Sequence, residues 1–452
     1  MQEVMRMASF VEKARFQDLS EKSKEAGKLR ILDSLGVALG ALRSPVPRKT
    51  RSFIQKTGAP GGSRLIGGGS SSPTHAAFQN SILIRYLDFN DSYLAPNETF
   101  HPSDGIGGLL ALGEYAKASG ESLILATALS YQIQAELSEK APVRKKGFDH
   151  TVQLSYAASA SLAKILALPE SEIANAIAIS GTANNALRVT RTGALSHWKG
   201  LAAPYTVFNA ANAVFLAREG ITGPAEIFEG NKGFKESIAG PFQVDWENLG
   251  LSAVERSIIK KYNAEIHSQS SIEGVLGLKK RYKFNVQEID AIQIDIFDVA
   301  FDIIGGGEEG EKQTITTKEE ADHSLPYLVA VALIDDDIFP EQFSSERINR
   351  NDVQSLLKRV SVAPSREFTD RFPEEMPAQI RIRLKNGEIF QTLSRDYEGF
   401  HTRPMKFDQV ARKFTRLTDG FLTEGKRSGI FDAVLSLERI TVAELMDQLF
   451  LD

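Results

Sequence analysis

The chain has 452 residues, a formal net charge of −5 at pH 7 and no cysteine. Its length exceeds that of one compact core, so we expect two domains. The lack of cysteine excludes disulfides, thiolate zinc sites, a cysteine nucleophile and cysteine-held iron–sulfur clusters. The charge shows no basic excess of the kind that binds nucleic acid.

The first part of the chain, residues 1–270, is expected to form a large helical domain. A serine-capped helix is predicted within residues 20–42, where apolar residues recur at helical spacing. The N-terminal 20 residues are amphipathic and carry acids, so they do not resemble a signal peptide. The most apolar window, residues 201–217, is too short for a membrane span and predicts a buried core helix.

Two glycine-rich stretches, residues 58–73 and 305–311, raise the possibility of phosphate-binding loops. Neither ends in Gly-Lys-Ser/Thr, and neither follows a strand pattern. We therefore expect both to be connecting loops.

The later part of the chain changes in pattern and predicts a smaller α+β domain over residues 271–398. Residues 290–301 alternate like a strand, and residues 379–395 form a hairpin pattern around Asn386-Gly387. Residues 399–452 are expected to be helices that return to the first domain. The predicted fold class is thus mainly α, with an all-helical domain built from both chain ends and an inserted α+β domain.

Histidines and one lysine stand at predicted helix starts. A cation is disfavoured there by about 0.3–1 kcal/mol because the helix N-terminus carries partial positive charge. Each histidine alone is more simply explained as a satisfied polar residue, but positions that break a local rule together are candidates for function. The residues are His75, His101, His150, His267 and His323, with Lys199 following a possible Ser196 cap.

Converging helix starts suit a small polyanion. Their unpaired N–H groups bind carboxylates or phosphates, and their positive ends keep a nearby imidazole neutral and able to act as a base. Arginines and lysines nearby could hold further carboxylates, although a solvated basic patch remains an alternative for the two lysines. These residues are Arg144, Lys145, Lys146, Arg188 and Arg191.

A metal site is an alternative for one of these segments, because Asp88 and Asp91 could ligate a cation with His101. The sequence has no H-E-x-x-H motif and no cysteine ligands, and the aspartate pair is a generic pattern. We therefore predict no metal.

A series of short motifs resembles the MmgE/PrpD family in order and spacing. The motifs are "YLDFNDSYLAP…HPSD", "GFDHTVQ", "NALRVTRTGALSHWKGLAA", "AEIHSQ", "ADHSLPYLVAVALID" and the closing "RPMKFDQVARKF". The resemblance covers residues 20–445. It implies a helical domain from both chain ends, an inserted α+β domain, a cleft between them, a homodimer and no required cofactor.

The resemblance also implies roles for individual residues. Asp91 and His101 match the family's aspartate–histidine pair, with Asp91 orienting or charge-balancing His101. His150, Lys199 and His267 match further catalytic positions. We expect His101 or His150 to move protons while Lys199 and Arg188 hold carboxylates. Further substrate-binding residues are expected at Arg144, Arg191, Ser196 and His323.

The expected activity is a cytoplasmic, cofactor-independent hydro-lyase that acts on a small hydroxy-tricarboxylic acid, as 2-methylcitrate dehydratases of the family do. Cis-aconitate decarboxylase activity is the main alternative. The decarboxylases carry a tyrosine before the "HS" motif, and residues 307–324 contain none. Epimerisation of an imino- or amino-diacid is a third possibility, and a polyanion-binding scaffold is the non-enzymatic one. No nucleic-acid or membrane partner is expected.

Overall fold

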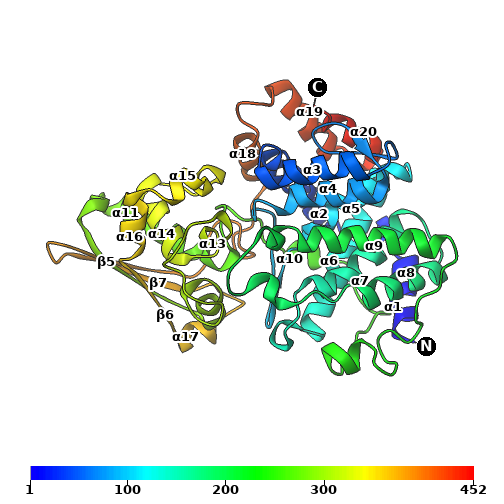
Figure 1. Ribbon diagram of the computed structural model, residues 1–452, viewed down its shortest axis with the longest axis horizontal. Helices are drawn as coiled ribbons and strands as arrows, with labels where there is room; N and C mark the ends of the chain where they lie inside the picture. The colour runs from blue at the N-terminus through cyan, green and yellow to red at the C-terminus, as the bar shows by residue number, and fades with distance from the viewer. Residues whose placement is uncertain (1, 452) are drawn as a thin grey trace. The chain divides into compact units, whose positions relative to one another are not determined.

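The computed structural model describes residues 2–451, and the chain divides into two compact units (Figure 1). Unit 1 comprises Met1–Arg188, Gly200–Ser257 and Lys406–Asp452, and unit 2 comprises Val189–Lys199 and Ile258–Met405. Helices account for most of the described chain, which confirms the mainly α class. No helix within residues 2–451 has both the length and the apolar character needed to cross a membrane.

Unit 1 is a bundle of helices with two short hairpins. Helix α7 lies at its centre, in contact with α6, α8 and α9, while α4 packs against α2, α5 and α9. The hairpins are β1 Ser63–Arg64 with β2 Ser70–Ser71, and β3 Tyr93–Ala95 with β4 Glu98–Phe100. The helices up to the boundary with unit 2 are α1 Glu3–Lys13, α2 Glu21–Ala41, α3 Pro45–Thr57, α4 Pro73–Arg85, α5 Ile106–Tyr115, α6 Gly120–Lys140, α7 Thr151–Ile165, α8 Glu170–Ala183, α9 Ala202–Arg218 and α10 Ala253–Arg256.

Local sequence signals explain how several of these helices begin and pack. The side chain of Ser20 accepts a hydrogen bond from the backbone N–H of Ser23, which confirms the predicted serine cap of α2. In α5, a Cβ added at Gly107 would lie 2.3 Å from the backbone nitrogen of Ser81 in α4. Only glycine allows this approach, so the two helices that flank the loop of His101 pack backbone to backbone.

The predicted core helix at residues 201–217 corresponds to α9, but the structure corrects its burial. Small residues such as Ala203 and Ala210 face the core, whereas Tyr205 and Leu216 are 42% and 46% exposed. Within this apolar run, small side chains are thus buried and some of the large ones are exposed.

The C-terminal segment packs on the N-terminal helices of unit 1. Helices α18 Phe407–Leu417 and α19 Glu424–Leu435 contact α2, and α20 Val442–Gln448 contacts α5. Figure 1 shows these red helices beside the blue and cyan ones. Residues from both ends of the chain therefore share one core.

Unit 2 contains a four-stranded sheet in the order β6-β5-β7-β8. The β5–β6 pair is parallel and the other pairs are antiparallel. Helices α11 and α14 pack together and against the sheet. The main elements are α11 Gln269–Tyr282, β5 Ile289–Ile296, α13 Lys318–Ala321, α14 Leu325–Asp335, α16 Asn351–Leu357, β6 Val360–Pro364, β7 Ala378–Leu384 and β8 Ile389–Ser394.

The strand predictions agree with this sheet. Strands β7 and β8 pair as a hairpin, and Gly387 in its turn adopts a φ of 91°, which glycine favours. Strand β5 ends at Ile296, so only the first part of the predicted strand 290–301 is extended. The glycine-rich stretch 305–311 is a connecting loop, and residues 58–73 form a connection that contains the β1–β2 pair.

The boundaries of the two units differ from the predicted domain limits of 270/271 and 398/399. Residues 189–199, 258–270 and 399–405, assigned to the helical domain from sequence, group with unit 2. Backbone hydrogen bonds explain the second segment, because Asn263 N donates to Ile338 O at 3.1 Å and Glu265 N donates to Asp322 O at 3.1 Å. No periodic pattern in the sequence reveals such irregular pairing.

Candidate active site

The loop between α4 and α5 in unit 1 carries His101 in a buried setting. Asp88 follows the end of α4 with a φ of 55°, in the left-handed region that aspartate tolerates. His101 precedes a 3₁₀ turn, Pro102–Gly105, that leads into α5, and it is 8% exposed. The prediction of a histidine at a helix start is confirmed here.

The hydrogen bonds of His101 define which of its ring nitrogens carries a proton. Its Nδ1 lies 2.8 Å from the backbone oxygen of Asp91 and 3.0 Å from Oγ of Ser92. A carbonyl oxygen only accepts, so Nδ1 donates a proton to it. In the neutral imidazole the lone pair is then on Nε2, which can accept a proton from a substrate.

This geometry changes the role expected for Asp91. Its backbone carbonyl orients His101, whereas its carboxylate oxygen Oδ1 accepts from the backbone N–H of Ser103 at 3.2 Å. The carboxylate oxygen Oδ1 of Asp88 lies 3.9 Å from His101 Nε2. The expected orientation of His101 is therefore supplied by the main chain, which the sequence pattern does not show.

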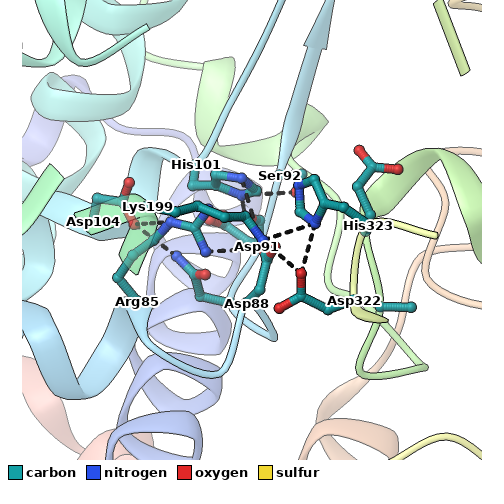
Figure 2. A network of polar contacts seen from close by, with 12 residues as sticks. Arg85, Asp88, Asp91, Ser92, His101, Asp104, Lys199, Asp322 and His323 are labelled. Carbon is teal, nitrogen blue, oxygen red and sulfur yellow. Dashed lines mark hydrogen bonds and ion pairs between the residues drawn. The ribbon is translucent and has the colours of Figure 1, made fainter. Parts of the chain in front are cut away.

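Charged and amide groups of the same loop are paired with one another (Figure 2). Arg85 donates to Asp88 Oδ1 at 2.8 Å, and its Nε lies 3.7 Å from Asp104 Oδ1. Asn90 donates to Asp104 Oδ1 at 3.0 Å. We call Arg85, Asp88, Asp91, His101 and Asp104 the His101 cluster. The guanidinium beside Asp88 repels a cation, so these contacts give no support to the metal alternative at Asp88, Asp91 and His101.

His150 lies beside His101 in unit 1. The two ring centroids are 5.7 Å apart with an interplanar angle of 71°. His150 is the N-cap residue of α7, and its Nδ1 lies 3.5 Å from Asp149 Oδ1. Arg188 approaches the same oxygen at 3.6 Å. Two imidazoles at this distance offer an acid and a base for one reaction.

The backbone N–H groups of Arg144 and Arg188 both donate hydrogen bonds to neighbouring groups of unit 1. Arg188 N donates to Gly147 O at 2.9 Å, and Arg144 N donates to Oε2 of Glu98 at 3.1 Å. Glu98 itself is 2% exposed. Burial raises the pKa of Glu98 to about 7, although hydrogen bonds from Val143 and Arg144 oppose the change.

In unit 2, Lys199 is buried against a carboxylate. It lies in the 3₁₀ turn His197–Gly200, which corrects the expected first turn of a long helix. Its Nζ is 2.5 Å from Asp322 Oδ1 and 2.8 Å from His323 Nδ1, and His323 Nδ1 is 2.7 Å from the same oxygen (Figure 2). Lys318 contacts Asp322 Oδ2 at 2.7 Å. We call these four residues the Lys199 cluster.

Charge decides the ionisation of Asp322. Burial opposes the charged form, but Lys199, Lys318 and His323 outweigh it and hold the pKa of Asp322 well below its usual range. The carboxylate therefore fixes the positions of the lysine and histidine that the sequence singled out.

His267, also in unit 2, has a carboxylate partner of its own. Its Nδ1 lies 2.6 Å from Oε1 of Glu265, and its backbone N–H donates to Oε2 at 2.7 Å. Burial opposes ionisation of Glu265, but His267, His323 and Lys260 lower its pKa. A carboxylate that accepts from one ring nitrogen fixes the orientation of the ring.

Two further predicted residues also lie in unit 2. Arg191 is buried and donates to the backbone oxygen of Lys199 at 3.3 Å. Ser196 is exposed, and its Oγ accepts from the backbone N–H of Trp198 at 3.3 Å. Unit 1 thus contains Asp91, His101, Arg144, His150 and Arg188, and unit 2 contains Arg191, Ser196, Lys199, His267 and His323.

Sequence reasoning missed the anions that organise these groups. Asp322 directly precedes His323, and Glu265 lies two residues before His267, so an acid beside each histidine was the available signal. Arg85 and Lys318 were also missed, although their acid partners Asp88 and Asp322 lie at i+3 and i+4 in the sequence.

Comparisons with known proteins agree with the motif pattern. The MmgE/PrpD N-terminal domain matches residues 5–247 and the MmgE/PrpD C-terminal domain matches residues 262–438. A 2-methylcitrate dehydratase of Salmonella typhi is 27% identical over 449 residues, which cover 92% of this chain and 91% of that protein. The mitochondrial 2-methylcitrate dehydratase of Yarrowia lipolytica is 25% identical, with 92% and 84% covered. Cis-aconitate decarboxylase of Mus musculus is 24% identical, with 93% and 88% covered. These relatives are lyases.

Proposed function

Since the chain belongs to the MmgE/PrpD family, we propose that it is a lyase that dehydrates a small hydroxy-tricarboxylic acid, with 2-methylcitrate as the first substrate to test. The names of its dehydratase relatives support the substrate class. The proposed reaction needs no metal and no organic cofactor.

The hydrogen bonding of His101 carries the proposal. With Nδ1–H bound to the Asp91 carbonyl, Nε2 takes a proton from the carbon next to a substrate carboxylate. The electron pair left on that carbon is delocalised into the carboxylate. As the carbon–oxygen bond breaks, the pair forms the new double bond and the hydroxyl leaves with a proton as water. His150 is the proposed donor of that proton.

Cations stabilise the negative charge that develops in this reaction. Hydrogen-bond donors and cations aimed at a developing anion lower the barrier most when they are already in place. We propose Lys199 and Arg188 for this task, with Arg144, Arg191, Ser196, His267 and His323 as further groups that bind or orient the substrate. The buried carboxylate of Asp322 lies 2.5 Å from the ammonium group of Lys199 and fixes its position.

Decarboxylation of cis-aconitate is the second candidate, supported by the likeness to the mouse decarboxylase. Both reactions develop negative charge beside a carboxylate, so the same residues suit either. The missing tyrosine in residues 307–324 favours dehydration. Epimerisation of an imino- or amino-diacid would use the same proton-transfer groups.

The test is an ultraviolet assay for new conjugated double bonds with purified, chelator-treated protein. 2-Methylcitrate, citrate and cis-aconitate are supplied in turn, and released carbon dioxide is trapped. Absorbance that rises with a hydroxy-acid, without gas, and that is lost in His101→Asn supports the proposed dehydratase. Gas from cis-aconitate would assign a decarboxylase instead, and no reaction with any of the three acids would refute the substrate class.

We also propose that the protein is a homodimer in the cytoplasm, as the family resemblance implies. Light scattering during gel filtration measures the first property, and a mass of one chain would contradict it. Cell fractionation measures the second.

A further inference from the structure

The closing motif "RPMKFDQVARKF", residues 403–414, has no role in the reaction described above. Its residues 407–414 lie in α18, where Lys413 is 7% exposed within unit 1. Lys413 Nζ donates to the backbone oxygen of Phe89 at 2.8 Å and pairs with Asp33 Oδ1 at 2.7 Å. It also lies 3.8 Å from the centre of the Phe89 ring. A cation from near the end of the chain is thus buried beneath the loop of His101.

Stability alone does not require this arrangement. Asp33, on α2, is 2% exposed, and replacing a buried ion pair by neutral groups is often neutral or stabilising. The contact with Phe89 is the distinctive one, because it fixes a main-chain carbonyl in a loop. Two residues later, the carbonyl of Asp91 is the acceptor for His101 Nδ1.

A second charged group acts on the same loop from α2. Arg30 is 6% exposed and is held by Ser257, whose Oγ accepts from its Nε at 2.8 Å. Burial lowers the pKa of Arg30, and the charge of Asp91 is the first influence that opposes this. Of these two buried cations, Lys413 from α18 donates a hydrogen bond to the loop, whereas Arg30 from α2 acts on Asp91 through its charge.

We propose that Lys413 is a positioning residue for His101. By holding the Phe89 carbonyl, it sets the path of the loop so that the Asp91 carbonyl accepts from Nδ1 and the lone pair of the neutral ring stays on Nε2, the proposed base. This inference rests on the proposed function for its catalytic consequence, but the tautomer of His101 can be observed without substrate.

The test compares four variants of the full-length protein, of which Lys413→Arg is the conservative one. Lys413→Met removes the contacts of the ammonium group with Phe89 and Asp33. Asp33→Asn/Lys413→Met removes both charges of the pair, so no buried charge is left alone. Asp33→Asn is the matched control, because it breaks the ion pair and leaves the bond from Lys413 to Phe89.

Two readouts are used. The first is kcat and KM for dehydration of 2-methylcitrate, and the second is the nitrogen-15 NMR signature of the His101 imidazole, assigned by comparison with His101→Asn. We expect the double variant to lose at least tenfold in kcat with little change in KM, and to lose the Nδ1–H tautomer preference. Asp33→Asn should keep both properties, and Lys413→Arg, which retains charge and donors, should restore part of each.

A folded double variant with wild-type kcat and an unchanged His101 signal would overturn the proposal. If the double variant does not fold, Asp33→Asn is compared with Lys413→Met. An equal loss of kcat and of the tautomer preference in these two variants would assign both effects to the ion pair and overturn the proposal. If the wild-type protein dehydrates none of the three acids, the proposed function fails, while the NMR comparison still tests the positioning of His101.

Discussion

Glu98 in unit 1 and Asp322 in unit 2 are equally hidden from solvent, at 2% and 0% exposed, but their pKa values move in opposite directions. Backbone N–H groups of Val143 and Arg144 bind Glu98, and burial prevails, raising its pKa to about 7. Two lysines and a histidine surround Asp322, and their charge prevails, lowering its pKa. The partners, rather than the depth of burial, decide which carboxylate is an anion near neutral pH.

The partner of the Nδ1 atom distinguishes His101 from the two histidines of unit 2. His101 donates to a neutral carbonyl, which fixes its tautomer without adding charge. The Nδ1 atoms of His267 and His323 instead lie against the carboxylates of Glu265 and Asp322. We infer a division of labour in which the His101 cluster moves protons and the Lys199 cluster provides charge for an anionic substrate.

The largest effect is expected for Asp322→Asn, which removes the anion at the centre of the Lys199 cluster. Breaking a buried ion pair from one side leaves charges without compensation and costs about 3–5 kcal/mol of unfolding free energy. Chemical denaturation followed by circular dichroism measures this loss.

A matched control is Asp322→Asn/Lys318→Met, which removes one positive charge together with the anion. It should recover part of the lost stability, because Lys318 contacts Asp322 Oδ2 at 2.7 Å. If Asp322→Asn is as stable as the wild type, the charge of Asp322 does not hold the cluster together.

The next effect concerns the pH dependence of stability at Glu98. Its folded pKa of about 7 lies above the unfolded value of 4.5, so the folded state binds more protons between these values and stability falls as pH rises through this window. The full loss is about 3 kcal/mol above pH 7. Glu98→Gln stays neutral and should be more stable than the wild type at pH 8, with a similar stability at pH 4.5.

The pKa of Asp322 is shifted in the direction opposite to that of Glu98, so its contribution to stability changes with pH in the opposite sense. Its lowered pKa gives stability that is present above pH 4 and is lost as pH falls further. Denaturation midpoints measured from pH 3 to pH 9 separate the two contributions. If stability varied with pH in the same way for Glu98→Gln and the wild type, folding would not change the pKa of Glu98. Glu98 would then be ionised in the folded protein above about pH 4.5.

The smallest effect is expected for Ser92→Ala. Ser92 Oγ lies 3.0 Å from His101 Nδ1, but the Asp91 carbonyl at 2.8 Å remains as an acceptor. Loss of one neutral hydrogen bond is worth about 1 kcal/mol, or about fivefold in kcat. Steady-state kinetics measure it, and a loss comparable to that of His101→Asn would mean that Ser92, not the carbonyl, orients the ring.

Local signals in the sequence explain what could be predicted. The Ser20 cap and the Asn386-Gly387 hairpin each depend on residues within a few positions. Histidines at helix starts could be found for the same reason.

The partners of these residues could not be found in the same way. Lys199 and Asp322 are 123 residues apart in sequence, and Lys413 and Phe89 are 324 apart. The acceptor for His101 is a main-chain carbonyl, which has no sequence signature. The raised pKa of Glu98 could not be predicted because burial in the folded chain produces it. Family resemblance supplied residue positions, and folding supplied the contacts that give them chemical roles.

The division of labour is tested most directly by calorimetric binding of 2-methylcitrate to His101→Asn and Lys199→Gln, both compared with the KM of the wild type. We expect His101→Asn to bind within about threefold of that value and to show no turnover, because only the proton acceptor is lost. Lys199→Gln should bind at least about tenfold more weakly, because a charged contact with the substrate is removed. Tight binding by Lys199→Gln together with weak binding by His101→Asn would contradict the account.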